Sequence, residues 1–314
     1  MARARGPIVS RLAAITAASI FMAASSSKVP VTVTSPWYPP DEMSLPLPTT
    51  LSPSKISAFK HCPLQFRFSV IDRLPEPPSP AASKGTLVHR ALELLMLRPP
   101  AERTQAAALA GLEQAQAELA DHPEFAGLEL DAEALDAFHA DARALLLRYF
   151  EVEDPAAVRP IGLELRLSVA LGSLTLRGVI DRLELDADGE LVVTDYKTGA
   201  VPSERAEQDR LGGVHFYSLL CDRLLGRRPV RVQLMYLSQP ELLSIAPSEQ
   251  SVTGMERRAL ALWAAVERAC ARDDFRPNRG RLCDWCNFQA YCPAWGGDPE
   301  QAVALRPEPV LLSV

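Results

Sequence analysis

The sequence contains few aromatic residues, few cysteines and no long apolar run. Aromatic side chains make up only 6% of its 314 residues. No run reaches the roughly 20 apolar residues that a membrane-spanning helix needs, which excludes an integral membrane protein. Six cysteines are too few for a disulfide scaffold. With 47% hydrophobic and 23% charged residues, the composition is typical of a folded chain of one or two domains, not of a disordered one.

A net positive charge is also missing. The formal charge of −6 argues against a general nucleic-acid coat protein. The acidity is concentrated in residues 98–154, which hold four Arg and Lys against thirteen Asp and Glu. Residues 51–97 hold six basic against three acidic side chains, and residues 255–292 hold seven against five. Both flanking segments are mildly basic, so the whole-chain charge says little about the partner.

The N-terminal residues 1–42 differ from the rest of the chain. Arginines precede an apolar stretch at 12–24, and three serines follow it, as in a secretory signal. The alternative, which we favour, is that translation starts at Met43. Residues 1–48 would then be a disordered or wrongly assigned extension, and the protein would be cytoplasmic and not secreted.

Apolar spacing predicts an α/β sandwich, a mixed sheet flanked by helices. A short helix opens at Ser52, and residues 101–150 read as two or three amphipathic helices of an acidic insert, about 98–154. Further helices are expected at 84–97, 212–225 and 255–272, and strands at 161–167, 174–185, 191–197 and 230–237.

The most informative stretch is a predicted hairpin that carries two aspartates. Asp181 lies in the strand 174–185, and Asp195 lies in the strand 191–197. The Asp-Gly pair between the strands is typical of a hairpin turn. If Asp186 pairs with Glu190, residue numbers across the ladder sum to 376, and Asp181 falls opposite Asp195.

Two opposed carboxylates destabilise such a ladder, so they need a physical reason. A shared Mg²⁺ or Mn²⁺ supplies one, because these ions prefer carboxylate oxygens. Lys197 projects from the same face as Asp195, where an ammonium group can orient a water and stabilise phosphate charge. The alternative is a solvent-facing Asp/Asp/Lys group on an edge hairpin.

The cysteines form a second pattern. Cys283, Cys286 and Cys292 have the close spacing of a metal site. Three ligands leave a fourth to be found, and Cys62 lies more than 200 residues earlier in the chain. Cys221 and Cys270 lie on apolar helical faces and are most simply core thiols.

Residues 51–295 resemble the PD-(D/E)XK nuclease superfamily, and specifically its RecB-like exonuclease branch, whose segments they follow in order. The resembling segments are the opening helix with its Cys-Pro (52–66), the Gly-x-x-x-His helix (85–89), the catalytic strands (178–181 and 195–197) and the C-terminal cysteines. The resemblance implies a restriction-endonuclease-like core, a nuclease domain over 49–295 and a flexible tail over 296–314.

The resemblance also implies the roles of individual residues. His89, Asp181 and Asp195 would hold Mg²⁺ or Mn²⁺ with the Tyr196 carbonyl, and Lys197 would position the water that attacks a phosphodiester. Glu164 corresponds to the upstream acidic residue of the family, with an ordinary exposed strand glutamate as the alternative.

The sequence departs from the branch on the helix after the catalytic lysine. The branch carries Gln-x-x-x-Tyr there, and Tyr217 matches its tyrosine, whereas Gly213 stands in place of its glutamine. Gln208 lies too far upstream to substitute at that spacing, so DNA positioning by the glutamine is in doubt.

For the cysteines, the resemblance implies a 4Fe–4S cluster on Cys62, Cys283, Cys286 and Cys292 that staples the C-terminal segment to the first helix, and spacing leaves Zn²⁺ open. Trp285 and Phe288 could stack on bases but are expected to shield the cluster. Six basic residues in the segments that the cysteines would join could follow DNA phosphates, with a scattered solvated surface as the alternative: Lys55, Lys60, Arg67, Arg276, Arg279 and Arg281.

The expected function is a metal-dependent DNA exonuclease of repair or recombination, acting on single-stranded ends. The chain has no Walker A sequence, so a helicase would be a separate partner. The alternative is an iron–sulfur DNA-binding accessory subunit without turnover, and Gly213 keeps that reading open.

Overall fold

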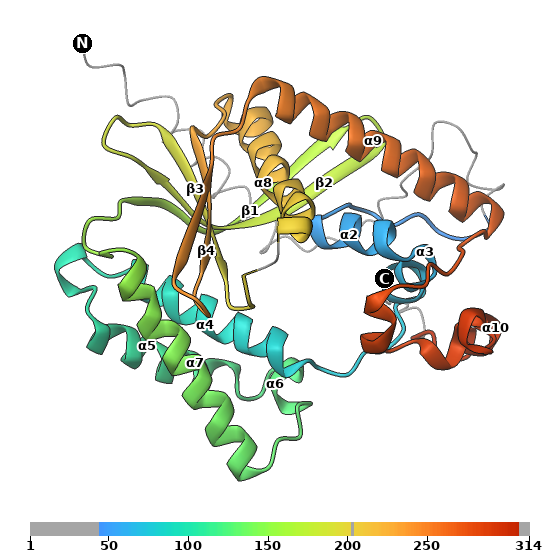
Figure 1. Ribbon diagram of the computed structural model, residues 1–314, viewed down its shortest axis with the longest axis horizontal. Coiled ribbons are helices and arrows are strands. Elements are labelled where there is room, and N and C mark those ends of the chain that lie inside the picture. Colours follow the sequence, from blue (N-terminus) through green and yellow to red (C-terminus); the bar gives the residue numbers. More distant parts are fainter. Residues whose placement is uncertain (1–43, 202–203, 308–314) are drawn as a thin grey trace, which may run out of the picture. The chain divides into compact units, whose positions relative to one another are not determined.

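The computed structural model describes residues 44–201 and 204–307 (Figure 1), apart from the side chains of 204–211. The expected N-terminal extension lies outside the described residues up to position 43. The described chain divides into two compact units. The first comprises residues 78–167 and 178–255, and the second comprises 44–77, 168–177 and 256–307. The predicted nuclease domain thus includes parts of both units.

The helices and strands follow one another in the order that the sequence predicts. The helices are α2 (Pro53–His61), α3 (Pro63–Phe66), α4 (Pro80–Met96), α5 (Gln105–Leu119), α6 (Pro123–Ala126), α7 (Ala132–Val152), α8 (Glu204–Leu225), α9 (Glu249–Arg272) and α10 (Pro299–Val303). The strands are β1 (Pro160–Leu171), β2 (Leu174–Leu185), β3 (Leu191–Lys197), β4 (Arg231–Tyr236) and β5 (Glu241–Ile245). Helix α4 begins four residues before the predicted start, because Pro80 occupies its first position.

The five strands form one mixed sheet in the order β1-β2-β3-β4-β5, which confirms the α/β class. β3 runs antiparallel to β2 and parallel to β4. Arg182 lies opposite Thr194, so residue numbers across the hairpin sum to 376, as predicted. β5 is an edge strand that the sequence analysis missed, because it is short and its Leu242 is 40% exposed, which weakens the apolar alternation.

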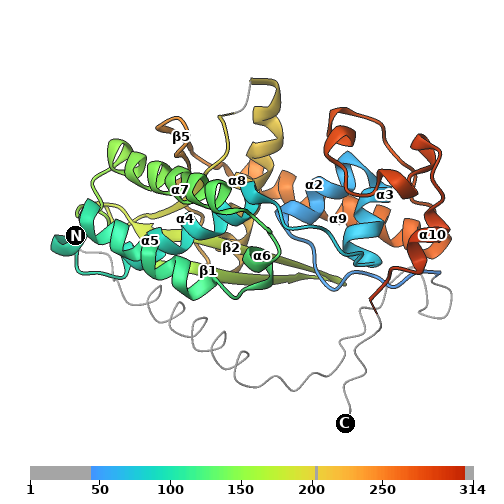
Figure 2. The same ribbon diagram turned by 90° about the horizontal axis from the view of Figure 1, so that it is seen from below.

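The acidic segment folds as the predicted helical insert. α5 and α7 pack with α4, and the three helices lie side by side (Figure 1 and Figure 2). Thr104 and Asp131 cap the N-termini of α5 and α7 with their side-chain oxygens. The helices share a buried core with Tyr196 and Met235 of the sheet. This packing sets α4 against the ends of the central strands.

On β2, Gly178 allows helix α8 to approach the sheet closely. A Cβ at Gly178 would lie 2.9 Å from Leu220 Cδ1 and 3.3 Å from Tyr217 Cε1. A side chain at this position would push α8 away from the strand. The glycine therefore fixes where Tyr217 sits relative to β2.

The second unit is built from segments that are distant in sequence. Leu51 pairs with Leu176 near the start of β2, and the Leu45 amide donates to the Cys270 carbonyl. The segment from 296, expected to be a flexible tail, contains α10, which begins after Asp298 because that side chain caps it. Arg306 then pairs with the buried Asp72. No helix of the described chain combines the length and apolarity that a membrane span requires.

Candidate active site

The two aspartates of the hairpin are both buried in the first unit. Asp181 is 8% exposed and Asp195 is 4% exposed. The Asp181 Oδ2 atom accepts a hydrogen bond of 2.7 Å from the Tyr196 backbone amide. The hairpin register therefore brings both carboxylates to one end of the central strands, which is the arrangement that the sequence predicts.

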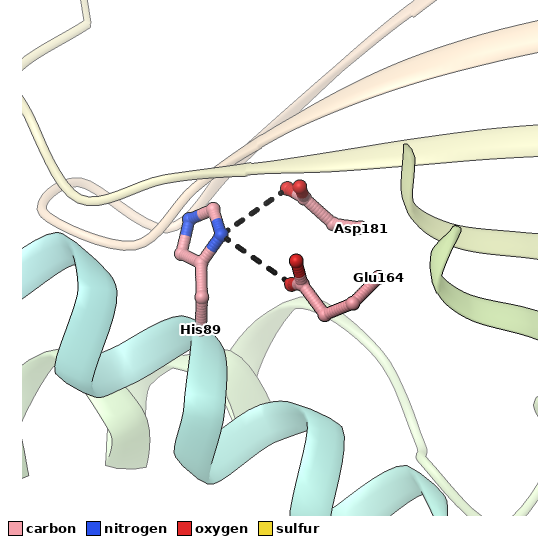
Figure 3. A group of neighbouring side chains, drawn as sticks. All are labelled: His89, Glu164 and Asp181. Carbon is pink, nitrogen blue, oxygen red and sulfur yellow. Dashed lines mark ion pairs between the residues drawn. The ribbon is translucent and has the colours of Figure 1, made fainter. Parts of the chain in front are cut away.

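Helix α4 contributes His89 to the same place (Figure 3). The His89 Nδ1 atom lies 3.5 Å from Asp181 Oδ2, and its Nε2 atom lies 3.1 Å from the Tyr196 carbonyl oxygen. In this arrangement Nε2 can donate to the Tyr196 carbonyl, and Nδ1 faces the Asp181 carboxylate. A ring nitrogen that carries no hydrogen can bind a metal ion, and both nitrogens lie beside oxygen atoms that could share the ion.

Glu164 completes a compact group with these two residues. Its Oε1 atom lies 4.0 Å from His89 Nδ1, and one ligand atom from each of His89, Glu164 and Asp181 falls within 4.8 Å of the others (Figure 3). Glu164 has a φ of 43°, which is the left-handed region that side chains rarely adopt. This local distortion of β1 accompanies the placement of the carboxylate in the site, so Glu164 is not an ordinary exposed strand glutamate.

The electrostatics of the group fit a divalent cation. Burial and the neighbouring Asp181 raise the pKa of Glu164 to about 7. Burial and Asp195 raise the pKa of Asp181 to about 6, although His89 opposes the shift. Burial and the repulsion between neighbouring carboxylates disfavour the ionised form of each group. An oxygen-preferring cation such as Mg²⁺ or Mn²⁺ would relieve that crowding, and His89, Glu164, Asp181 and Asp195 could hold it.

We expect Asp181→Asn to stabilise the metal-free protein and to remove its stabilisation by Mn²⁺. The substitution deletes a crowded charge, and the asparagine oxygen still accepts the hydrogen bond from Tyr196. The measurement is the thermal midpoint in EDTA and in Mn²⁺. A variant that gains as much from Mn²⁺ as the wild type would show that Asp181 is not a ligand.

The same site predicts a pH dependence for the metal-free wild type. The raised folded-state pKa values mean that the folded protein binds more protons than the unfolded chain between about pH 4 and pH 7. Stability from these groups is therefore present below about pH 4 and is lost as the pH rises toward 7. The slope of the free energy of unfolding against pH should be shallower in Asp181→Asn than in the wild type.

Lys197 and Tyr217 both contact Asp195. The Lys197 ammonium forms an ion pair with Asp195 Oδ2. Burial alone would lower the pKa of Lys197, but the Asp195 carboxylate outweighs it, so the pKa is raised and the ammonium keeps its charge. Burial and Asp195, to which it hydrogen-bonds, raise the pKa of Tyr217, which keeps the phenol protonated.

On α8, one turn before Tyr217, Gly213 lies where the branch carries glutamine. A Cβ at Gly213 would meet no atom of the described residues within 4 Å. A side chain could therefore begin at this position without a clash of its Cβ with the described residues.

Arg182 is a residue near the site that the sequence analysis missed. Its side chain is fully buried, and it forms ion pairs with Glu153 and Glu184. It also donates to the Tyr196 hydroxyl over 3.0 Å and to Thr194 Oγ1 over 3.1 Å. Because the Tyr196 backbone contacts both His89 and Asp181, this network holds the strand that positions the site. An arginine within an apolar strand, next to Asp181, is the signal that could have found it.

The four predicted cysteines come together in the second unit. All four line one pocket of about 690 Å³, and Cys62, Cys283 and Cys292 contribute to a raised pKa of Cys286, for which burial is the main cause. Backbone amides of Asn278 and Gly280 donate to Cys62 and Cys283 over 3.4 Å each. Cys221 and Cys270 are buried elsewhere, as predicted for core thiols.

The six basic residues expected to contact DNA are not equivalent. The Lys55 ammonium donates to Thr50, Arg67 pairs with Asp72 and Asp273, and Arg276 pairs with Asp274. Lys60 is exposed on the last turn of α2. Arg279 and Arg281 line the pocket that contains the cysteines. These two arginines are therefore the better placed of the six to meet a ligand.

Comparison with solved structures gives similarity at low sequence identity. A candidate exonuclease from Eubacterium rectale is 13% identical, with 76% of this chain and 87% of that chain covered and a TM-score of 0.49. The crystal structure of SSO0001 is also 13% identical, with 78% and 86% covered and a TM-score of 0.38. No curated protein sequence matches the chain.

The family assignment rests on a sequence comparison. The family model of the PD-(D/E)XK nuclease superfamily matches residues 50–293. The match contains the hairpin with Asp181 and Asp195, the His89 helix and all four clustered cysteines. The chain belongs to the PD-(D/E)XK nuclease superfamily.

Proposed function

We propose that the protein is a metal-dependent DNA exonuclease of the RecB-like branch, which hydrolyses phosphodiester bonds at single-stranded ends in DNA repair or recombination. The observation that carries the proposal is the grouping of His89, Glu164 and Asp181 in a chain of the nuclease superfamily. The Asp195–Lys197 ion pair on the next strand supplies a cation beside these acidic groups.

Each group has a distinct role in the proposed reaction. His89, Glu164, Asp181 and Asp195 would hold the divalent ion, with the Tyr196 carbonyl as a further oxygen ligand. The ion, when bound, would polarise the scissile phosphate. The Lys197 ammonium would orient the attacking water and stabilise charge that develops on the phosphate oxygens. Tyr217, which hydrogen-bonds to Asp195, would position the Asp195 carboxylate without touching the reacting atoms.

We further propose that the four cysteines hold a 4Fe–4S cluster. All four line one pocket of the second unit. Four thiolates are the ligand set of a 4Fe–4S cluster.

We expect Cys286→Ala to remove the visible absorption and the iron content of anaerobically purified protein and to lower its thermal midpoint. The matched control is Cys221→Ala, which deletes a buried thiol of the first unit and should keep the iron. Zinc in place of iron in the wild type would contradict the cluster.

The proposed function is tested with two substrates, end-labelled linear single-stranded DNA and circular single-stranded DNA. Each is incubated with Mg²⁺ or with EDTA. We expect Mg²⁺-dependent release of short products from the linear strand, no cleavage of the circle, and slower attack on duplex ends. Cleavage of the circle would indicate an endonuclease. Binding without any cleavage would favour the accessory subunit. Because the chain lacks a Walker A sequence, a helicase that supplies single strands would be a separate partner.

A further inference from the structure

Two tryptophans near the cysteines are exposed to solvent. Trp285 is 84% exposed and Trp295 is 46% exposed, whereas Phe288 between them is 3% exposed and packs against Phe68 at 5.4 Å between ring centroids. Phe288 is therefore buried beside the cysteines, as a shielding side chain would be, whereas Trp285 lines the same pocket and leaves most of its surface in solvent. Large aromatic surfaces left in water commonly mark binding sites.

The exposed rings belong to a concave surface that carries positive charge. Trp285, Trp295, Arg279 and Arg281 line the pocket of about 690 Å³, together with His61. The Arg279 guanidinium carbon lies 4.8 Å from the centroid of the Trp295 ring, which is a cation–π geometry. In its described residues the second unit holds thirteen Arg and Lys against nine Asp and Glu. The acidity of the chain therefore lies outside this unit.

We propose that this surface binds a single strand of nucleic acid, with unpaired bases stacking on Trp285 and on the Arg279–Trp295 pair. Arg281 would contact the phosphates. Stacking requires exposed flat rings, and arginine serves both a base face and a phosphate. The positive charge of the unit matches a polyanion. The proposal rests on the proposed function for the identity of the ligand, and it assigns a strand-binding site separate from the catalytic carboxylates.

The test measures the anisotropy of fluorescein-labelled oligo(dT) bound to the full-length protein in EDTA, where metal-dependent cleavage is absent. We expect Trp285→Ala to weaken binding about 10- to 100-fold, as loss of a stacked base does. Trp285→Phe should restore most of the affinity. The matched control is Leu305→Ala, which removes a 44% exposed apolar side chain of the same unit that does not line this pocket and should change little.

A strand of the same length with abasic sites separates the contribution of base stacking from that of the phosphate contacts. Its affinity should be weak and equal for the wild type and Trp285→Ala, because it offers phosphates without bases. Equal oligo(dT) affinity of wild type and Trp285→Ala would overturn the proposal. The proposal would also be overturned if the wild type formed a dimer and Trp285→Ala dissociated it without changing strand binding. The surface would then be a protein interface.

Cleavage by the wild type in Mg²⁺ is measured separately and distinguishes this proposal from the proposed function. Cleavage with strand binding independent of Trp285 would leave the nuclease intact and remove the strand-binding site. Binding that depends on Trp285, without cleavage, would support the site and reject the exonuclease.

Discussion

Lys197→Met should lower the rate of DNA hydrolysis by about 10³-fold, the loss that follows removal of one preorganised electrostatic donor from an active site. The Lys197 ammonium forms an ion pair with Asp195 and keeps its charge, so it supplies a fixed cation beside the proposed metal ligands. Methionine retains most of the aliphatic stem and removes the charge. The measurement is single-turnover cleavage of end-labelled single-stranded DNA at saturating Mg²⁺.

The control for this substitution is Lys84→Met on α4. Lys84 also pairs with an aspartate, Asp141, at 3.0 Å, but it lies outside the site, so its loss should leave the rate within a few-fold of the wild type. The variant Lys197→Met should still gain thermal stability from Mn²⁺, because Lys197 is not a ligand. If it cleaves DNA at the wild-type rate, Lys197 has no catalytic role and the assignment of the hairpin is wrong.

Arg182→Met should lower the free energy of unfolding by about 3–5 kcal/mol, the loss expected when a buried ion pair loses one partner. The substitution would leave Glu153 and Glu184 without the guanidinium that pairs with both. It would also remove the donor to the Tyr196 hydroxyl. Urea denaturation with EDTA present measures the loss in the metal-free protein.

A surface arginine provides the comparison for Arg182. Arg90 also pairs with two glutamates, Glu93 and Glu118, but this cluster is partly exposed, so Arg90→Met should cost much less. Adding Glu153→Gln and Glu184→Gln to Arg182→Met should recover part of the stability, because no buried charge is then left unpaired. Equal losses for Arg182→Met and Arg90→Met would show that burial of the network is energetically unimportant.

The hairpin could be predicted from sequence because its determinants are local. An Asp-Gly turn fixes the register, and the register fixes which residues of β2 and β3 are opposite one another. Asp181, Asp195 and Lys197 follow from that register alone. Three of the four cysteines could be predicted from their close spacing within ten residues, whereas Cys62 was implied only by the resemblance to the nuclease branch.

Other parts of the site depend on tertiary structure. The role of Glu164 requires a residue of β1 to adopt a φ of 43°, and no side-chain pattern encodes that conformation. The burial of Arg182 depends on Glu153 at the C-terminal end of α7, which is 29 residues away. The exposure of Trp285 was missed because proximity to the cysteines in sequence does not determine which aromatic ring is buried. In each case the deciding contact is not local.

The second unit consists of three segments, residues 44–77, 168–177 and 256–307. Its first segment leaves the ribosome long before its last segment is synthesised. Until then, buried residues of the first segment such as Phe68 lack partners such as Phe288. The first unit ends near residue 255 and is available for folding earlier, so the two units should be completed in that order during synthesis. A chain that stops before Cys283 would retain Asp181 and Asp195 but leave that early apolar segment uncovered, as a substrate for chaperones and proteases.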